Sequence, residues 1–129
     1  MTKGQQIFQV RRVFPQMQHS RSNGLHVWLG TLQPAPDSVR CTIRIEWRPQ
    51  KPPKVFVVDP ALVDNAPHRY NDNSLCLYDH REQPWRPTDL VARTIIPWTA
   101  EWLYWYEVWL EYGEWMGPEA SHTGPKELE

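Results

Sequence analysis

The chain lacks several features that mark common functional classes. Its 129 residues carry 14 lysines and arginines against 15 aspartates and glutamates, a formal net charge of -1. Domains that bind nucleic acid by neutralising phosphates usually have a clear basic excess, so we expect no nucleic acid partner. The sequence also contains no Gly-rich phosphate loop and no Cys-x-x-Cys pair. Nucleotide hydrolysis and thioredoxin-like redox chemistry are therefore unsupported, and we expect no cofactor.

Long apolar segments are missing as well. No apolar run approaches the length of a bilayer span, and residues 1–9 are polar, without the apolar stretch of a secretory signal. Two cysteines allow at most one disulfide. We expect a cytoplasmic protein with reduced thiols that works without a membrane. The length suits one hydrophobic core, with a domain over residues 1–116 and a flexible tail over residues 117–129.

Turn signals and alternation predict a β-rich first half. Asn23-Gly24 readily adopts the positive φ values of a tight hairpin turn, so residues 14–19 and 25–32 should form its two arms. Leu25, Val27 and Leu29 share one face of the second arm. His26 then shares the other face with Trp28, and we interpret it as a polar residue on an exposed strand face.

Residues 39–47 (VRCTIRIEW) show the clearest alternation in the chain, which predicts a half-buried antiparallel strand. Cys41 belongs to its apolar face, so we expect a small buried hydrophobe and not a nucleophile. The short β-branched sequence of residues 54–58 (KVFVV) predicts one further strand. Residues 3–13 fit either a short amphipathic helix or an entering strand.

The second half of the chain is rich in tryptophan, with five of the eight between Trp98 and Trp115. Thr88 is a candidate N-cap for a helical stretch over residues 90–96. Pro97 would either kink that helix or occupy the first turn of a new one. From Trp98 onward the tryptophans recur at helical spacing until Gly113, which should end the helix. Strands followed by helices predict an α+β fold.

Residues 66–87 separate the two halves and contain Cys76. A thiol needs a neighbouring base or a lowered pKa to be a good nucleophile, and its reaction needs a donor to the oxyanion. Nearness in sequence makes several polar residues candidates for these roles, namely His68, His80, Asn71, Asp72 and Asn73. A zinc site on Cys76, His68 and His80 lacks a fourth ligand, so we expect no metal. The alternative is a structural, buried cysteine.

Several motifs stand in one order: Trp28-x-Gly30, the strand ending at Trp47, Pro52-Pro53, Ser74-Leu75-Cys76-Leu77 and Trp85-x-Pro87. In this order they resemble the core of ubiquitin-conjugating enzymes. The resemblance implies a four-stranded antiparallel meander, then a Cys-bearing loop and a long Trp-rich helix. It also implies that Cys76 takes an acyl group as a thioester and passes it to an amine.

The resemblance includes one departure. The family's cysteine is preceded by a His-Pro-Asn tripeptide, whose asparagine is linked to loop structure and to stabilising the oxyanion. Here the matching residues are Ala66-Pro67-His68. His68 therefore takes the asparagine's place, as an oxyanion donor or a loop organiser, and an imidazole could also act as a base. A plain packing role is the alternative.

A second set of segments, 75–78, 94–103 and 106–115, is similar to bacterial ubiquitin-conjugating-like proteins of CBASS antiphage operons. This similarity implies that a cGAS-like nucleotidyltransferase is the acyl donor or target, joined through its C-terminus. A separate activating enzyme is a possible further partner. The competing hypotheses are a catalytically silent scaffold of the same fold and a cysteine protease or deconjugating enzyme.

Overall fold

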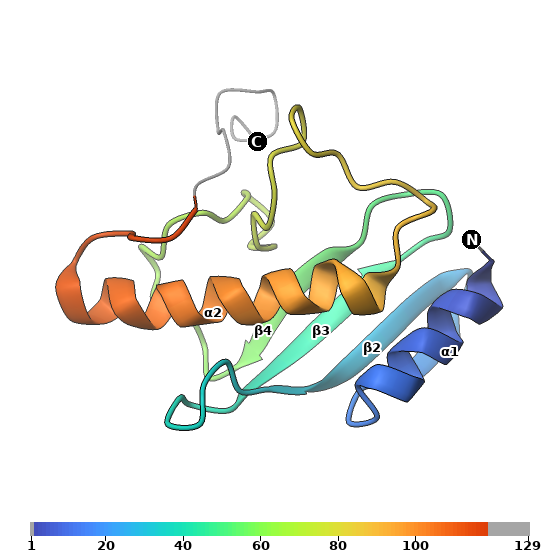
Figure 1. Cartoon of the computed structure of the whole chain (residues 1–129), viewed down its shortest axis with the longest axis horizontal. Coiled ribbons are helices and arrows are strands. Elements are labelled where there is room, and N and C mark those ends of the chain that lie inside the picture. Colours follow the sequence, from blue (N-terminus) through green and yellow to red (C-terminus); the bar gives the residue numbers. More distant parts are fainter. Residues whose placement is uncertain (1, 119–129) are drawn as a thin grey trace.

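The structure, a computed structural model, describes residues 2–118 (Figure 1). In chain order, one helix precedes a four-stranded antiparallel sheet and a second, longer helix follows it. The strands are β1 (Gln18–Ser22), β2 (Leu25–Leu32), β3 (Cys41–Trp47) and β4 (Lys54–Asp59). Each strand pairs with its neighbour in sequence, giving the order β1-β2-β3-β4. The predicted α+β class and the antiparallel meander are confirmed.

Helix α1 (Lys3–Val13) settles the choice between helix and strand for the first segment. Thr2 caps it, because its hydroxyl accepts from the Gln5 backbone while the Gln5 side chain accepts from the Thr2 backbone. On the inner side, the buried Gln6 amide donates to the Asp89 carbonyl and accepts from the Val91 N–H. Through Gln6, α1 is tied to the segment that leads into the last helix.

The predicted hairpin turn is confirmed, since Asn23 has φ 53° and Gly24 has φ 79°. Its first arm, however, begins at Gln18 and not at residue 14. The reason is a turn in which the Met17 N–H donates to the Phe14 carbonyl, so residues 14–17 connect α1 to the sheet. All five residues of β1 are exposed, as suits an edge strand.

Our prediction of which face of β2 is buried is wrong. His26 and Trp28 are 2% and 1% exposed, whereas Leu29 is 45% exposed. Strand pairing explains this reversal, because His26 lies opposite Trp47 of β3, and paired residues point to the same side of a sheet. His26 is accommodated in the core because its Nδ1 lies 2.9 Å from His19 Nε2 and its ring packs against Trp47.

Strand β3 confirms the predicted alternation, with Ile43, Ile45 and Trp47 all buried, but it starts two residues later than predicted. The Val39 N–H donates to the Glu107 carboxylate instead of joining the sheet. Cys41 is half-buried, whereas we predicted that it would be fully buried. Burial, together with the charges of Glu107 and Asp59, raises the pKa of its thiol, which disfavours the thiolate.

The predicted helix over residues 90–96 with Thr88 as its cap is wrong. A short 3-10 turn, η1 (Val91–Arg93), precedes helix α2 (Ile95–Tyr112). The Gln6 side chain accepts a hydrogen bond from the Val91 N–H. Pro97, which has no N–H, lies in the first turn of α2, where it breaks no helical hydrogen bond. Gly113, at φ 78°, ends α2 as predicted.

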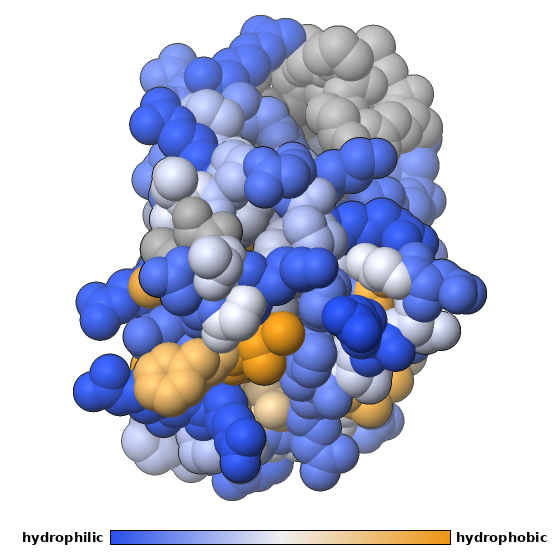
Figure 2. Space-filling model, turned by 90° about the vertical axis from the view of Figure 1, so that its right-hand side faces the viewer, coloured by the Kyte–Doolittle hydropathy of each residue, from blue (hydrophilic) through white to orange (hydrophobic). Residues whose placement is uncertain are grey.

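Both helices lie on one face of the sheet (Figure 1), so the core lies between the helices and that face. It includes Val10 of α1, Ile43 and Ile45 of β3, and Ile96 and Leu103 of α2. The opposite face is open, with Leu29 and Val58 about half exposed. The side shown in Figure 2 is largely hydrophilic with small apolar groups. Within residues 2–118, no helix has the length and apolar character to cross a membrane.

We predict that stability falls in mild acid through His26. Burial, and secondarily the charges of His19, Arg21 and Lys3, lowers its pKa from the ordinary value of 6.5. The folded protein thus favours the neutral ring, and its full stability exists above pH 6.5 and is lost as pH falls toward the lowered pKa. The thermal midpoint, measured by circular dichroism, should drop between about pH 7.5 and about pH 5.

The matched variant is His26→Gln, whose amide cannot be protonated but can still hydrogen-bond to His19. It should reduce the pH dependence of the midpoint, although part of it remains because burial also lowers the pKa of His19. An unchanged pH dependence in this variant would show that other groups control acid stability.

Candidate functional site

The segment between β4 and η1 has little regular structure, as predicted, but it is anchored to the sheet. The Leu75 N–H donates to the Val55 carbonyl at 2.9 Å, and Leu75 also forms a β-bridge with Arg69. These contacts bring residues 69–75 back on themselves as a tight turn. Residue 76 therefore leaves the turn from a fixed position beside β4.

Asp72 holds this turn together. Its carboxylate accepts from the Ser74 N–H at 2.9 Å and the Ser74 hydroxyl at 2.5 Å, and it pairs with Lys54 at 2.8 Å. Burial alone would raise the pKa of Asp72, but the hydrogen bonds from Lys54 and Ser74 outweigh it and lower the pKa to about 2. The structure thus gives Asp72 a turn-forming position rather than a place beside the thiol.

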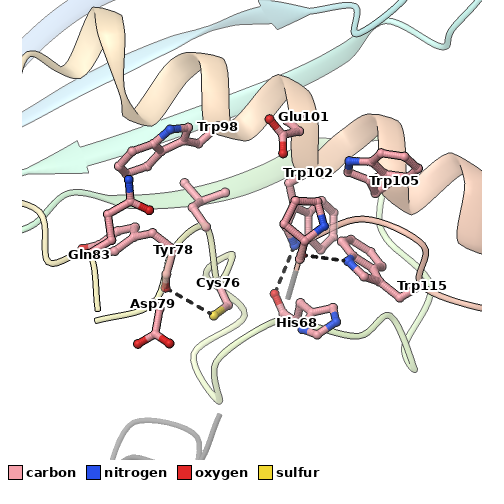
Figure 3. Close-up of a pocket in the computed structure, with 12 residues that line it drawn as sticks. His68, Cys76, Tyr78, Asp79, Gln83, Trp98, Glu101, Trp102, Trp105 and Trp115 are labelled. Atoms are coloured by element: carbon pink, nitrogen blue, oxygen red, sulfur yellow. Dashed lines mark hydrogen bonds between the residues drawn. The ribbon is translucent and has the colours of Figure 1, made fainter. Parts of the chain in front are cut away.

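Cys76 is 6% exposed and lies in a pocket of about 280 Å³ between the loop and α2 (Figure 3). Its N–H donates to the His68 carbonyl at 2.9 Å, and its sulfur lies 4.0 Å from the Tyr78 carbonyl oxygen. From the loop, His68 and Tyr78 also line the pocket; α2 contributes Trp98, Glu101, Trp102 and Trp105. The structure therefore brings Cys76 and His68 together at one pocket.

His68 has φ 58°, in the left-handed region that asparagine and histidine enter more readily than most residues. Its carbonyl accepts two hydrogen bonds, from the Cys76 N–H and from the Trp102 indole N–H at 3.2 Å. Its imidazole packs edge-on to Trp115 with ring centroids 4.6 Å apart. In Figure 3 the imidazole lies on the Trp115 side while the sulfur points toward the Tyr78 carbonyl.

The other sequence candidates lie outside this pocket. His80 packs against Tyr78 and Tyr70 and lines a neighbouring pocket with Lys54. Asn71 is exposed, and neither pocket includes it. Since His80 does not line the Cys76 pocket, the zinc ligands that we considered do not converge there. Across residues 2–118, no three or more His, Cys, Asp and Glu side chains are placed to hold a metal ion.

Arg69 is important for the loop, and sequence reasoning missed it. Its guanidinium donates to the carbonyls of Val63, Asp64 and Ala66, at 3.2, 2.7 and 3.3 Å. A loop without regular structure needs such partners for its carbonyls. No motif marks this arginine, because its partners are backbone atoms. The bonds fix the path of the chain directly before His68.

The pocket also contains polar groups that sequence reasoning did not select, namely Asp79, Gln83 and Glu101. Asp79 starts a turn by accepting from the N–H groups of Arg81 and Glu82. Tyr78 packs against Trp98, and burial, with the charges of Cys76 and Asp89, raises its pKa to about 12. Its phenol therefore stays protonated at neutral pH.

The chain after α2 returns to the pocket. Trp115 packs against Trp102 with ring centroids 5.5 Å apart, and Pro118 lines the pocket. The predicted tail begins at residue 117. Gly117 lies against Trp105 of α2, and Pro118 lines the pocket. The remainder of that tail, residues 119–129, lies outside the described residues.

Comparison with known proteins adds a family to this geometry. No curated protein matches the chain. A family model described as "Type II CBASS E2 protein" matches residues 6–123, which include the sheet, the Cys76 loop and all of α2. The match spans most of the 129 residues and agrees with the similarity that the Trp-rich segments indicate. The chain therefore belongs to the E2-CBASS family of Type II CBASS E2 proteins.

Proposed function

We propose that the domain has a ubiquitin-conjugating fold and that Cys76 is the nucleophile of an acyl transferase. One observation carries this proposal: in a chain of an E2 family, Cys76 lies in a pocket with its backbone hydrogen-bonded to His68. E2 is the general term for ubiquitin-conjugating enzymes. A nucleophile must be held in a fixed geometry beside its substrate, and the His68 carbonyl supplies such a restraint.

The proposed reaction has two steps. The Cys76 sulfur attacks the carbonyl carbon of a C-terminus activated as an acyl adenylate or a thioester. A C–S bond forms, the bond to AMP or to the donor thiol breaks, and the Cys76 thiol loses its proton. An acceptor amine then attacks the thioester carbon, so that a C–N bond forms, the C–S bond breaks, one amine proton is released and the Cys76 thiolate is regenerated.

His68 serves this reaction as an oxyanion donor or a loop organiser. Its contacts support the second role, because its carbonyl joins Cys76 to Trp102 and its ring packs against Trp115. Its left-handed backbone is also a conformation that the family's asparagine would accept. An asparagine in place of His68 would therefore keep the backbone conformation of this loop, although its side-chain chemistry differs.

The proposed partner is a cGAS-like nucleotidyltransferase of the same operon, whose C-terminus is the acyl donor or target, and the proposed location is the cytoplasm. A separate activating enzyme would supply the activated acyl group. The CBASS family supports an operon partner of this kind. The alternative is a scaffold that binds the nucleotidyltransferase without chemistry, and the low exposure of Cys76 favours it.

We predict that Cys76 carries a thiol-labile adduct. The wild-type protein, incubated with the nucleotidyltransferase, the activating enzyme and ATP, should give a species that a reducing agent cleaves on a denaturing gel. Cys76→Ala should give none, and the matched control Cys41→Ala should give as much as wild type. A scaffold would bind the nucleotidyltransferase in a pull-down, but wild type and Cys76→Ala would show the same absence of adduct.

We predict that His68 variants separate backbone from side-chain roles. His68→Asn should form the adduct at a rate within about threefold of wild type, because asparagine tolerates positive φ. His68→Val should lose at least about tenfold, because a β-branched residue is strained there by roughly 1–3 kcal/mol. His68→Gly keeps the backbone without any side-chain donor. Retained adduct formation in His68→Gly supports the loop role, whereas a loss in both His68→Gly and His68→Val, with His68→Asn active, supports the oxyanion role.

A further inference from the structure

Residues 114–118 return along α2 after the helix ends, and we refer to them as the lid. Gly113 reverses the chain with φ 78°, while its N–H donates to the Trp109 carbonyl. The Trp115 ring then contacts both walls of the pocket, with centroids 4.6 Å from His68 of the loop and 5.5 Å from Trp102 of α2. The Trp115 indole N–H donates to the Pro118 carbonyl at 3.2 Å, so the lid is folded upon itself (Figure 3).

Gly117 sets how closely the lid approaches α2. A Cβ atom added at Gly117 would lie 2.3 Å from two ring atoms of Trp105, far closer than carbon atoms can approach. The backbone of the lid therefore lies directly on the indole of Trp105, and only glycine fits there. The next residue, Pro118, lines the Cys76 pocket. The lid is thus built from residues whose shapes match the pocket wall.

The lid is held by ring packing. Within residues 2–118, no hydrogen bond joins residues 114–118 to the Cys76 loop or to the sheet. Segments with few buried contacts and no backbone hydrogen bonds to the core are the ones that open locally without unfolding the domain. The ring contacts of Trp115 and the contact of Gly117 with Trp105 are therefore the interactions that must break for the lid to move away from the pocket.

We propose that the lid covers Cys76 in the resting protein and must lift from Trp105 before a macromolecular acyl donor reaches the sulfur. Cys76 is only 6% exposed, and the lid forms part of the wall of its pocket. The regulatory meaning of this closure rests on the proposed function of Cys76. The coverage of the thiol does not, because any thiol reagent meets the same barrier.

The test measures alkylation of Cys76 by iodoacetamide and by a polyethylene-glycol maleimide, with each cysteine followed separately by peptide mass spectrometry. Gly117→Ala should prevent the lid from seating and raise the Cys76 rate at least about fivefold, more for the larger reagent. Gly4→Ala is the matched control, since an added Cβ there meets only the Thr2 hydroxyl, at 3.9 Å. It should react at the wild-type rate, and the Cys41 rate should be equal in all three proteins.

Trp115→Ala, with Trp109→Ala as its control, provides an independent pair. Trp115→Ala should accelerate Cys76 alkylation and Trp109→Ala should not, with circular dichroism showing all variants folded. Equal Cys76 rates in wild type, Gly117→Ala and Trp115→Ala would overturn the lid. Faster alkylation in the lid variants without any acyl adduct would overturn the proposed function and leave the lid. Acyl adduct formation together with equal Cys76 alkylation in wild type and the lid variants would overturn the lid and leave the proposed function.

Discussion

A single main-chain oxygen joins the two halves of the candidate site. The His68 carbonyl accepts from the Cys76 N–H, which fixes the cysteine within its loop, and from the Trp102 indole, which fixes the loop to α2. Each such bond contributes about 1 kcal/mol net, and a buried polar group left without its partner costs more. The hydrogen bonds of Arg69 fix the chain before His68, and those of Asp72 fix the turn after it, so together they set the position of this oxygen.

The hydrophobic core serves this arrangement from a distance. The sheet receives the loop through the bond between Leu75 and Val55, and α1 positions the start of α2 through the buried amide of Gln6. The two walls of the pocket are therefore attached to different parts of one rigid core. This division explains why a loop with little regular structure can still hold a thiol in a fixed place.

Local chemistry made part of the fold predictable. Asn23-Gly24, the alternation ending at Trp47 and Gly113 each determine backbone structure within a few residues. The buried face of β2 could not be predicted, because pairing with β3 decides it and both faces carry apolar residues. The 3-10 turn before α2 is bonded to Gln6, which lies 85 residues before Val91, and sequence patterns do not reveal a contact over that distance. Family motifs make Cys76 and His68 candidates, and their roles stay predictions, whereas Arg69 acts on backbone carbonyls that no motif records.

The concentration of tryptophan has an optical consequence. All eight tryptophans lie within the described residues, and four of them, Trp98, Trp102, Trp105 and Trp115, line the one pocket that holds Cys76. Half of the intrinsic emitters therefore surround the sulfur, two of them with indole N–H groups bonded to carbonyls of the site and the lid. The native fluorescence of the unlabelled chain is consequently weighted toward this pocket, and its emission wavelength reports the wetting of those indoles.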